Sequence, residues 1–190
     1  MVAGAAFLLL ILLACAYPYP SRAAAAPSPS SSIVLSACAH ARYPSLCVRT
    51  LNLTTHSSDT DFARITTASA LSSARHAAAF LRGGPLPASA AFRECARLLL
   101  HSVDQLDRAS RHLAGDKAAP APRRLGDAQT WVSAAMTDQD MCLQELGAEE
   151  AAGSARNGLS ARVTAAWQLA SNALYFINQL SDSRGRGRNN

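Results

Sequence analysis

The sequence is poor in aromatic residues and in charge. Aromatic side chains make up 6% of the 190 residues and charged side chains 16%, whereas alanine and leucine dominate the composition. An alanine-rich chain with few aromatic residues favours helix over strand. No segment alternates apolar and polar residues between turns, as a half-buried strand would. These absences exclude a sheet-based fold and predict an all-α protein.

The residue patterns that carry catalysis are absent as well. The sequence holds no HExxH or ExxH pair, no GxSxG turn and no glycine-rich phosphate loop. His101 and His112 share a predicted helix, but three turns place them about 16 Å apart, too far for one metal ion. We therefore expect no catalytic residue, no metal and no cofactor, and we predict that the chain is not an enzyme.

The net charge of +5 is not arranged as a basic stripe along a helix. This argues against a nucleic-acid partner. Three arginines lie in the glycine-rich segment 183–190, which we predict to be a disordered basic tail. A basic surface of this kind suits an acidic extracellular polysaccharide.

The N-terminus resembles a secretory leader. The apolar run Phe7–Ala16 is shorter than the roughly 20 residues that span a bilayer, and small residues follow it. We predict a signal peptide over 1–25, a flexible entry over 26–32, and no membrane segment after cleavage. Removal of the leader leaves four of the five cysteines, an even set that indicates two disulfides in an oxidising compartment: Cys38, Cys47, Cys95 and Cys142.

Apolar periodicity predicts six helices. Two short ones over 33–38 and 47–53, broken at Tyr43-Pro44, form a hairpin that a Cys38–Cys47 disulfide would close. Four longer ones follow, over 58–82, 88–113, 127–147 with Asp127 as N-cap, and 154–180. The last has apolar residues at steps of three and four throughout: Leu159, Val163, Ala166, Ala170, Ala173, Ile177 and Leu180. Short connections imply an antiparallel up-and-down four-helix bundle, with the hairpin before it, in one domain over 33–182.

The antiparallel arrangement also predicts the second disulfide. Cys95 lies 18 residues before Leu113, and Cys142 lies 15 residues after Asp127. At 1.5 Å per residue these lengths are roughly 27 and 22 Å, so both cysteines reach the same end of neighbouring helices. We therefore expect a Cys95–Cys142 disulfide. Trp131 and Trp167, on or beside apolar positions, are expected to pack in the core.

Two surface features point to binding rather than catalysis. The third long helix has polar residues at spacings of three and four, which predicts an exposed face formed by Thr130, Ser133, Thr137, Asp140 and Gln144. This face could be a binding site or a merely solvated surface. Asn52-Leu53-Thr54 is an N-glycosylation acceptor, which in an exported chain would lie on the surface.

Three segments resemble the plant invertase and pectin methylesterase inhibitors. They are the first-hairpin stretch Cys38–Cys47, the stretch Glu94–Leu106 with its Glu-Cys and Val-Asp-Gln-Leu elements, and the stretch Asp127–Cys142. The likeness covers about residues 33–181. It is strongest over Asp127–Cys142, which is similar to the pectin methylesterase-inhibitor branch. The Pro-Lys-Phe motif of the invertase-inhibitor branch is absent after the second long helix.

The resemblance implies a four-helix bundle with an N-terminal hairpin and two disulfides in sequential order. It further implies a secreted, non-covalent inhibitor in the apoplast that covers the pectin-binding cleft of a pectin methylesterase. The polar face of the third long helix is then the expected contact with the esterase. Two alternatives stay open: an inhibitor of acid invertase, and a non-inhibitory wall protein that holds acidic pectin through its basic tail.

Overall fold

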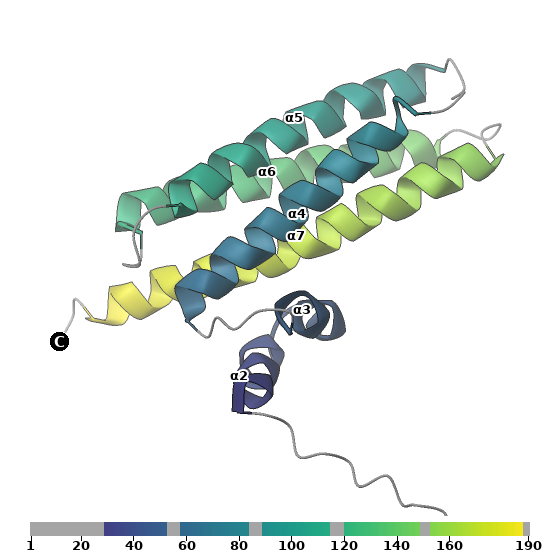
Figure 1. Cartoon of the computed structure of the whole chain (residues 1–190). Coiled ribbons are helices and arrows are strands. Elements are labelled where there is room, and N and C mark those ends of the chain that lie inside the picture. The colour runs from purple at the N-terminus through teal and green to yellow at the C-terminus, as the bar shows by residue number, and fades with distance from the viewer. Residues whose placement is uncertain (1–28, 53–57, 84–88, 115–119, 149–152, 188–190) are drawn as a thin grey trace, which may run out of the picture.

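The computed structural model describes residues 29–52, 58–83, 89–114, 120–148 and 153–187. The predicted signal peptide lies outside the described residues. The described residues form six helices and no strand (Figure 1). Their bounds are α2 Pro29–Cys38, α3 Pro44–Leu51, α4 Asp59–Phe80, α5 Ala90–Leu113, α6 Pro122–Gly147 and α7 Gly153–Gly187.

The four long helices form the bundle that the periodicity predicts. Each helix runs antiparallel to its neighbours along the chain, and α7 returns to pack on α4 (Figure 1). All seven apolar positions predicted for the last helix are buried, from Leu159 to Leu180. The short helices α2 and α3 form a hairpin that lies against the side of the bundle, on α4 and the middle of α7 (Figure 1). The all-α bundle with an N-terminal hairpin is therefore confirmed.

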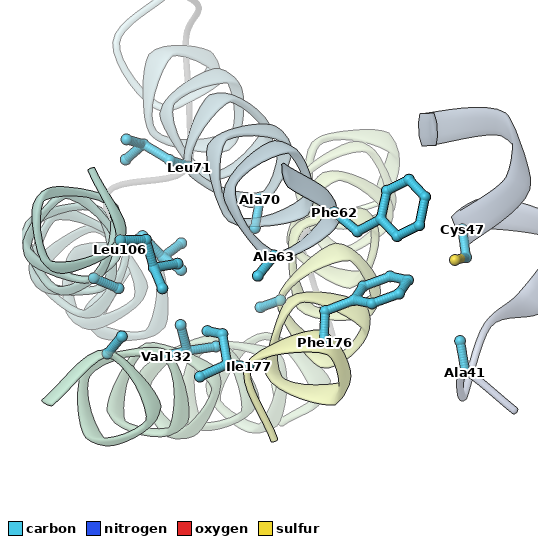
Figure 2. Close-up of a cluster of buried hydrophobic side chains, with 14 of the residues drawn as sticks. Ala41, Cys47, Phe62, Ala63, Ala70, Leu71, Leu106, Val132, Phe176 and Ile177 are labelled. Atoms are coloured by element: carbon cyan, nitrogen blue, oxygen red, sulfur yellow. The ribbon is translucent and has the colours of Figure 1, made fainter. Parts of the chain in front are cut away.

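Small side chains fill much of the core. Buried alanines on α4 and α7, such as Ala70 and Ala170, let these two helices approach closely. Two large aromatic side chains lie where the hairpin docks, and Figure 2 shows Phe62 and Phe176 pointing toward Cys47. Their ring centroids lie 5.5 Å apart. These two rings fill the junction between the hairpin and the bundle, whereas Phe92 belongs to a second cluster of buried residues.

Both disulfides join the cysteines expected from the sequence. Cys38 pairs with Cys47 at a Cα–Cα distance of 5.7 Å, and Cys95 pairs with Cys142 at 4.3 Å. The first closes the hairpin and the second links α5 to α6. Each disulfide therefore lies within one part of the molecule, and neither joins the hairpin to the bundle.

The predicted start of the third long helix is wrong. Helix α6 begins at Pro122 with Ala121 as N-cap, so Asp127 lies inside the helix rather than at its N-cap. Proline is well suited to the first turn because it needs no amide donor there. The first turn is also held by Arg124, whose Nη2 donates hydrogen bonds to the carbonyls of Arg111 and Ala114 at the end of α5.

The segments predicted to be flexible are partly helical. Helix α2 begins at Pro29, so residues 29–32 of the predicted entry are helical. Helix α7 continues to Gly187, so residues 183–187 of the predicted disordered tail are helical too. Arg184 explains this continuation, since its Nη1 donates a hydrogen bond to the carbonyl of Pro120 just before α6. Residues 26–28 and 188–190 lie outside the described part.

Candidate binding surface on helices α6 and α7

The polar residues predicted to share one face of α6 are all exposed. They are Thr130, Ser133, Thr137, Asp140 and Gln144. The buried positions of α6 lie on the other side of the helix, and they include Ala128, Val132, Ala135 and Cys142. The predicted division of α6 into a core stripe and a polar face is therefore present. That this face contacts an enzyme stays a prediction.

Hydrogen bonds within α6 determine which donors and acceptors of this face remain available to a partner. The hydroxyls of Thr130 and Thr137 donate to the carbonyls of Gly126 and Ser133, at 3.0 and 3.1 Å. The Gln144 side-chain amide donates to Asp140 Oδ2 at 2.9 Å. Because both threonine hydroxyls donate their hydrogen bonds within the helix, their oxygens can only accept hydrogen bonds from a partner.

The polar face borders an open groove between α6 and α7. The groove has a volume of about 340 Å³ and is lined by Ser133, Met136, Thr137, Asp140, Trp167 and Leu174. On α6 the lining runs from residue 133 to 140, which is roughly 10 Å of helix. Farther along both helices, the Gln129 amide donates to Asn178 Oδ1 at 2.8 Å and links α6 to α7.

Three of the groove residues were not among the expected site residues. Met136, Trp167 and Leu174 are half-buried, so the expectation that Trp167 packs in the core is wrong. The sequence does contain a signal for the two on α7. Trp167 and Leu174 are seven residues apart, each one position after a core alanine, which indicates a second apolar stripe beside the buried one.

The hairpin holds the Trp167 side of the groove in place. Tyr43 stands edge-on to Trp167, with ring centroids 6.1 Å apart. The Arg42 guanidinium lies 5.2 Å from the centre of the indole ring. Asn172, which is fully buried, accepts from the Tyr43 amide at 3.1 Å and donates to the Tyr43 carbonyl at 3.0 Å. The hairpin is thereby fixed to α7 beside the groove.

Helix α6 is held rigidly from its inner side. Gln139 is fully buried and its amide donates to the Ser102 hydroxyl on α5 at 2.8 Å. Cys142 is tied to α5 by its disulfide. These two links lie next to Asp140, so the polar face belongs to a helix with little freedom to shift.

The side of α6 that faces α5 is charged instead. Asp138 Oδ2 lies 2.9 Å from His101 Nδ1. On α5, hydrogen bonds from the exposed Arg97 guanidinium hold the pKa of Glu94 below its ordinary value. Arg108 lies 5.0 Å above the ring of Trp131, which is half-buried. The charged groups on this side thus belong mainly to α5, whereas the opposite side of α6 is rich in hydroxyl groups.

The other predicted sites lie away from the groove. Asn52 is exposed at the C-cap of α3, whereas Thr54 of its acceptor motif lies outside the described residues. Of the tail arginines, Arg184 is half-buried against Pro120 and Arg186 is exposed. Among the described residues no group of three or more His, Cys, Asp or Glu side chains could hold a metal ion.

Comparison with known proteins gives one consistent family. Residues 32–176 match the family model described as plant invertase/pectin methylesterase inhibitor. Pectinesterase inhibitor 3 of Arabidopsis thaliana is 37% identical over 169 residues, covering 81% of this chain and 82% of that protein. Pectinesterase inhibitor 9 of the same plant is 30% identical over 166 residues, covering 80% and 81%.

A solved structure supports the fold independently. A mutant form of a pectin methylesterase inhibitor from Arabidopsis superposes with a TM-score of 0.60 and 23% identity. The match covers 74% of this chain and 92% of the solved chain. At this level of identity the similarity supports the bundle and its hairpin.

Proposed function

Because the chain belongs to the plant invertase/pectin methylesterase inhibitor family, we propose that it is a secreted inhibitor of a pectin methylesterase. The family consists of inhibitors, so the chain is not an enzyme. In this proposal it binds the esterase non-covalently and covers the pectin-binding cleft with the polar face of α6.

The observation that carries the proposal is the exposed, hydroxyl-rich face on a rigid helix. Thr130, Ser133 and Thr137 add no charge that would have to be desolvated on binding, and they offer oxygens that accept hydrogen bonds. The Cys142 disulfide and the Gln139 hydrogen bond hold the helix in place before binding. Less conformational freedom is therefore lost when a partner binds.

Secretion into the apoplast is the location that fits this partner. Two disulfides are typical of proteins that fold in an oxidising compartment. Among the described helices, none has the length and apolar character needed to cross a bilayer. The proposed leader over 1–25 would direct export.

Two alternatives are carried into the test. The family description also names invertase inhibitors, but the stretch 115–124 lacks their Pro-Lys-Phe motif. A non-inhibitory wall protein would bind acidic pectin through its C-terminal arginines. Since Arg184 already contacts Pro120, this role would fall to Arg186 and Arg188.

The deciding experiment measures inhibition across both enzyme classes. The mature protein with both disulfides formed is titrated against a panel of pectin methylesterases and acid invertases, and against pectin alone. We expect saturable inhibition of at least one esterase and none of the invertases. Inhibition of invertases only, or pectin binding without any inhibition, would overturn the proposal in favour of the corresponding alternative.

The position of the interface is tested by Thr137→Arg. This residue is exposed at the middle of the polar face, so a long charged side chain there should obstruct the contact. We expect the dissociation constant to rise at least about tenfold, or about 1.4 kcal/mol. Ser72→Arg on α4 is the matched control, since Ser72 is exposed on the helix diagonally opposite α6. If Thr137→Arg inhibits the esterase as strongly as Ser72→Arg does, the interface does not include this face of α6.

A further inference from the structure

The groove between α6 and α7 contains a single ionisable side chain. Of its six lining residues, Asp140 carries a carboxylate and Ser133 and Thr137 carry hydroxyls. The remaining three are apolar: Met136, Trp167 and Leu174. The formal charge of the lining is therefore negative, although the whole chain has a net charge of +5.

The polar atoms of the groove mainly accept hydrogen bonds. The Thr137 hydroxyl donates its hydrogen bond to the Ser133 carbonyl, so its oxygen can still accept one from a partner. Asp140 receives one hydrogen bond from Gln144, and a carboxylate has about four lone-pair sites in all. A complementary occupant must therefore bring donors and, because of Asp140, a positive charge.

The apolar wall of the groove is suited to a cation as well. The exposed Arg42 of this chain already rests above the Trp167 ring, at 5.2 Å from its centre. Electron density on the face of an indole attracts cations, and tryptophan is the strongest such partner among the side chains. Met136 and Leu174 offer apolar surface for the methylene stem of a long basic side chain.

We propose that this groove is a receptor for one basic side chain, an arginine or a lysine, that projects from the surface of the target esterase. The charged group pairs with Asp140 and is oriented by the hydroxyl oxygens of Ser133 and Thr137. Its stem packs on Met136 and Leu174 beside the indole. This inference rests on the proposed function and identifies the chemistry by which the same surface recognises its partner.

The main test removes the charge of Asp140 without changing its shape. Binding of Asp140→Asn to an esterase that the unmodified protein inhibits is measured by calorimetry. We expect the dissociation constant to rise about tenfold or more. Glu145→Gln is the matched control, because Glu145 is exposed on α6 outside the groove lining and its removal changes the net charge equally. The control should change affinity less than about threefold.

A second variant tests the sign of the occupant's charge. Arg42→Gln removes the guanidinium that lies over Trp167. This guanidinium should repel a basic side chain that enters the groove. With a basic occupant, affinity for the esterase should rise about two- to threefold. An acidic occupant, such as an aspartate of the esterase, would use Arg42 as its partner, and the same variant would then weaken binding. Weaker binding of Arg42→Gln would therefore overturn the inference.

The partner's basic residue can then be located. Each exposed arginine or lysine near the esterase cleft is changed to glutamine and combined with Asp140→Asn. The loss for one such pair should be smaller than the sum of the single losses, which identifies the two residues as neighbours. If no basic residue shows this coupling, the groove does not receive a cation.

The outcomes separate this inference from the proposed function. If the unmodified chain inhibits an esterase and Asp140→Asn behaves as Glu145→Gln does, inhibition stands and the cation receptor is wrong. If Asp140→Asn and Trp167→Leu lose binding to methyl-esterified oligogalacturonide but inhibit normally, the groove is a sugar site and the inference is overturned. If no esterase is inhibited, both proposals fail together.

Discussion

At the scale of single residues, the side-chain amide of Asn172 connects two parts of the molecule. It is buried in α7 and satisfies both the donor and the acceptor of the Tyr43 backbone. Tyr43 is the residue before Pro44, where the hairpin turns into α3. This one amide therefore makes two hydrogen bonds between the hairpin and the bundle, whereas an apolar side chain of the same size would make neither.

Asn172→Leu should loosen the hairpin. The change preserves approximate volume but leaves the Tyr43 amide and carbonyl without their partner, which costs about 1–3 kcal/mol. We expect faster hydrogen exchange at Cys47 and Leu51 in α3, with unchanged exchange in α5. Asn178→Leu serves as control, since Asn178 is exposed and its side chain accepts from Gln129 in α6 rather than from the hairpin. Equal protection of α3 in both variants would contradict the role assigned to Asn172.

Buried polar residues are also where sequence reasoning fell short. Gln139 lies between two aspartates in the sequence, yet it is fully buried and its amide donates to the Ser102 hydroxyl. A polar residue on a helix is expected to face water, and only the three-dimensional neighbour on another helix reveals why it does not. Asn172 could not be predicted for the same reason, because its partner lies 129 residues away.

At the scale of elements, two predicted helix starts show what a capping residue can and cannot decide. Ser58, the first residue of the helix predicted over 58–82, is the N-cap of α4, and its side-chain oxygen accepts from the Asp61 amide at 3.1 Å. Asp127 has the right chemistry for a cap but lies inside α6, because the helix already starts at Pro122. The type of a residue therefore shows that it could be an N-cap, but only the observed start of the helix shows whether it is one.

The two positions should respond differently to alanine. Ser58→Ala removes a used N-cap and should cost about 1 kcal/mol of unfolding free energy. Asp127→Ala should change it by less than about 0.5 kcal/mol, since its nearest ionic partner, His112, is 3.6 Å away at the surface. Urea unfolding monitored by circular dichroism gives both values. A larger loss for Asp127→Ala would mean that α6 starts later than Pro122.

Most of the element pattern was predictable, and the reasons are physical. The seven positions from Leu159 to Leu180 were found because a helix buried along its length must repeat apolar residues every three or four positions. The ends of α2 and α7 were missed, since serine, glycine and arginine there carry no apolar period. The polar face of α6 followed from the spacing, whereas the wall formed by Trp167 required the placement of α7 beside α6.

At the scale of the whole molecule, two disulfides stabilise two parts that are joined without a covalent cross-link. The separations along the chain are 9 residues for Cys38–Cys47 and 47 residues for Cys95–Cys142. A longer loop loses more conformational entropy when it is closed in the unfolded chain. The disulfide of the bundle should therefore contribute more to stability than that of the hairpin.

Paired alanine substitutions test this order. Replacing Cys95 and Cys142 together should lower the unfolding free energy by about 4 kcal/mol, and replacing Cys38 and Cys47 by about 3 kcal/mol. Denaturant titrations of the two double variants and the unmodified chain give the values under identical conditions. The reverse order would show that loop entropy does not dominate the contribution of these cross-links.

The placement of the two cross-links also sets how far the chain can be stretched. Under tension applied at residues 29 and 187, the helices can unravel, but the chain between Cys95 and Cys142 stays a closed ring. That ring withholds roughly 16 nm of extended length, and the hairpin ring withholds roughly 3 nm. Because the rings are separate along the chain, reduction would release these two lengths independently. Each disulfide would thus be visible as its own step in molecular length.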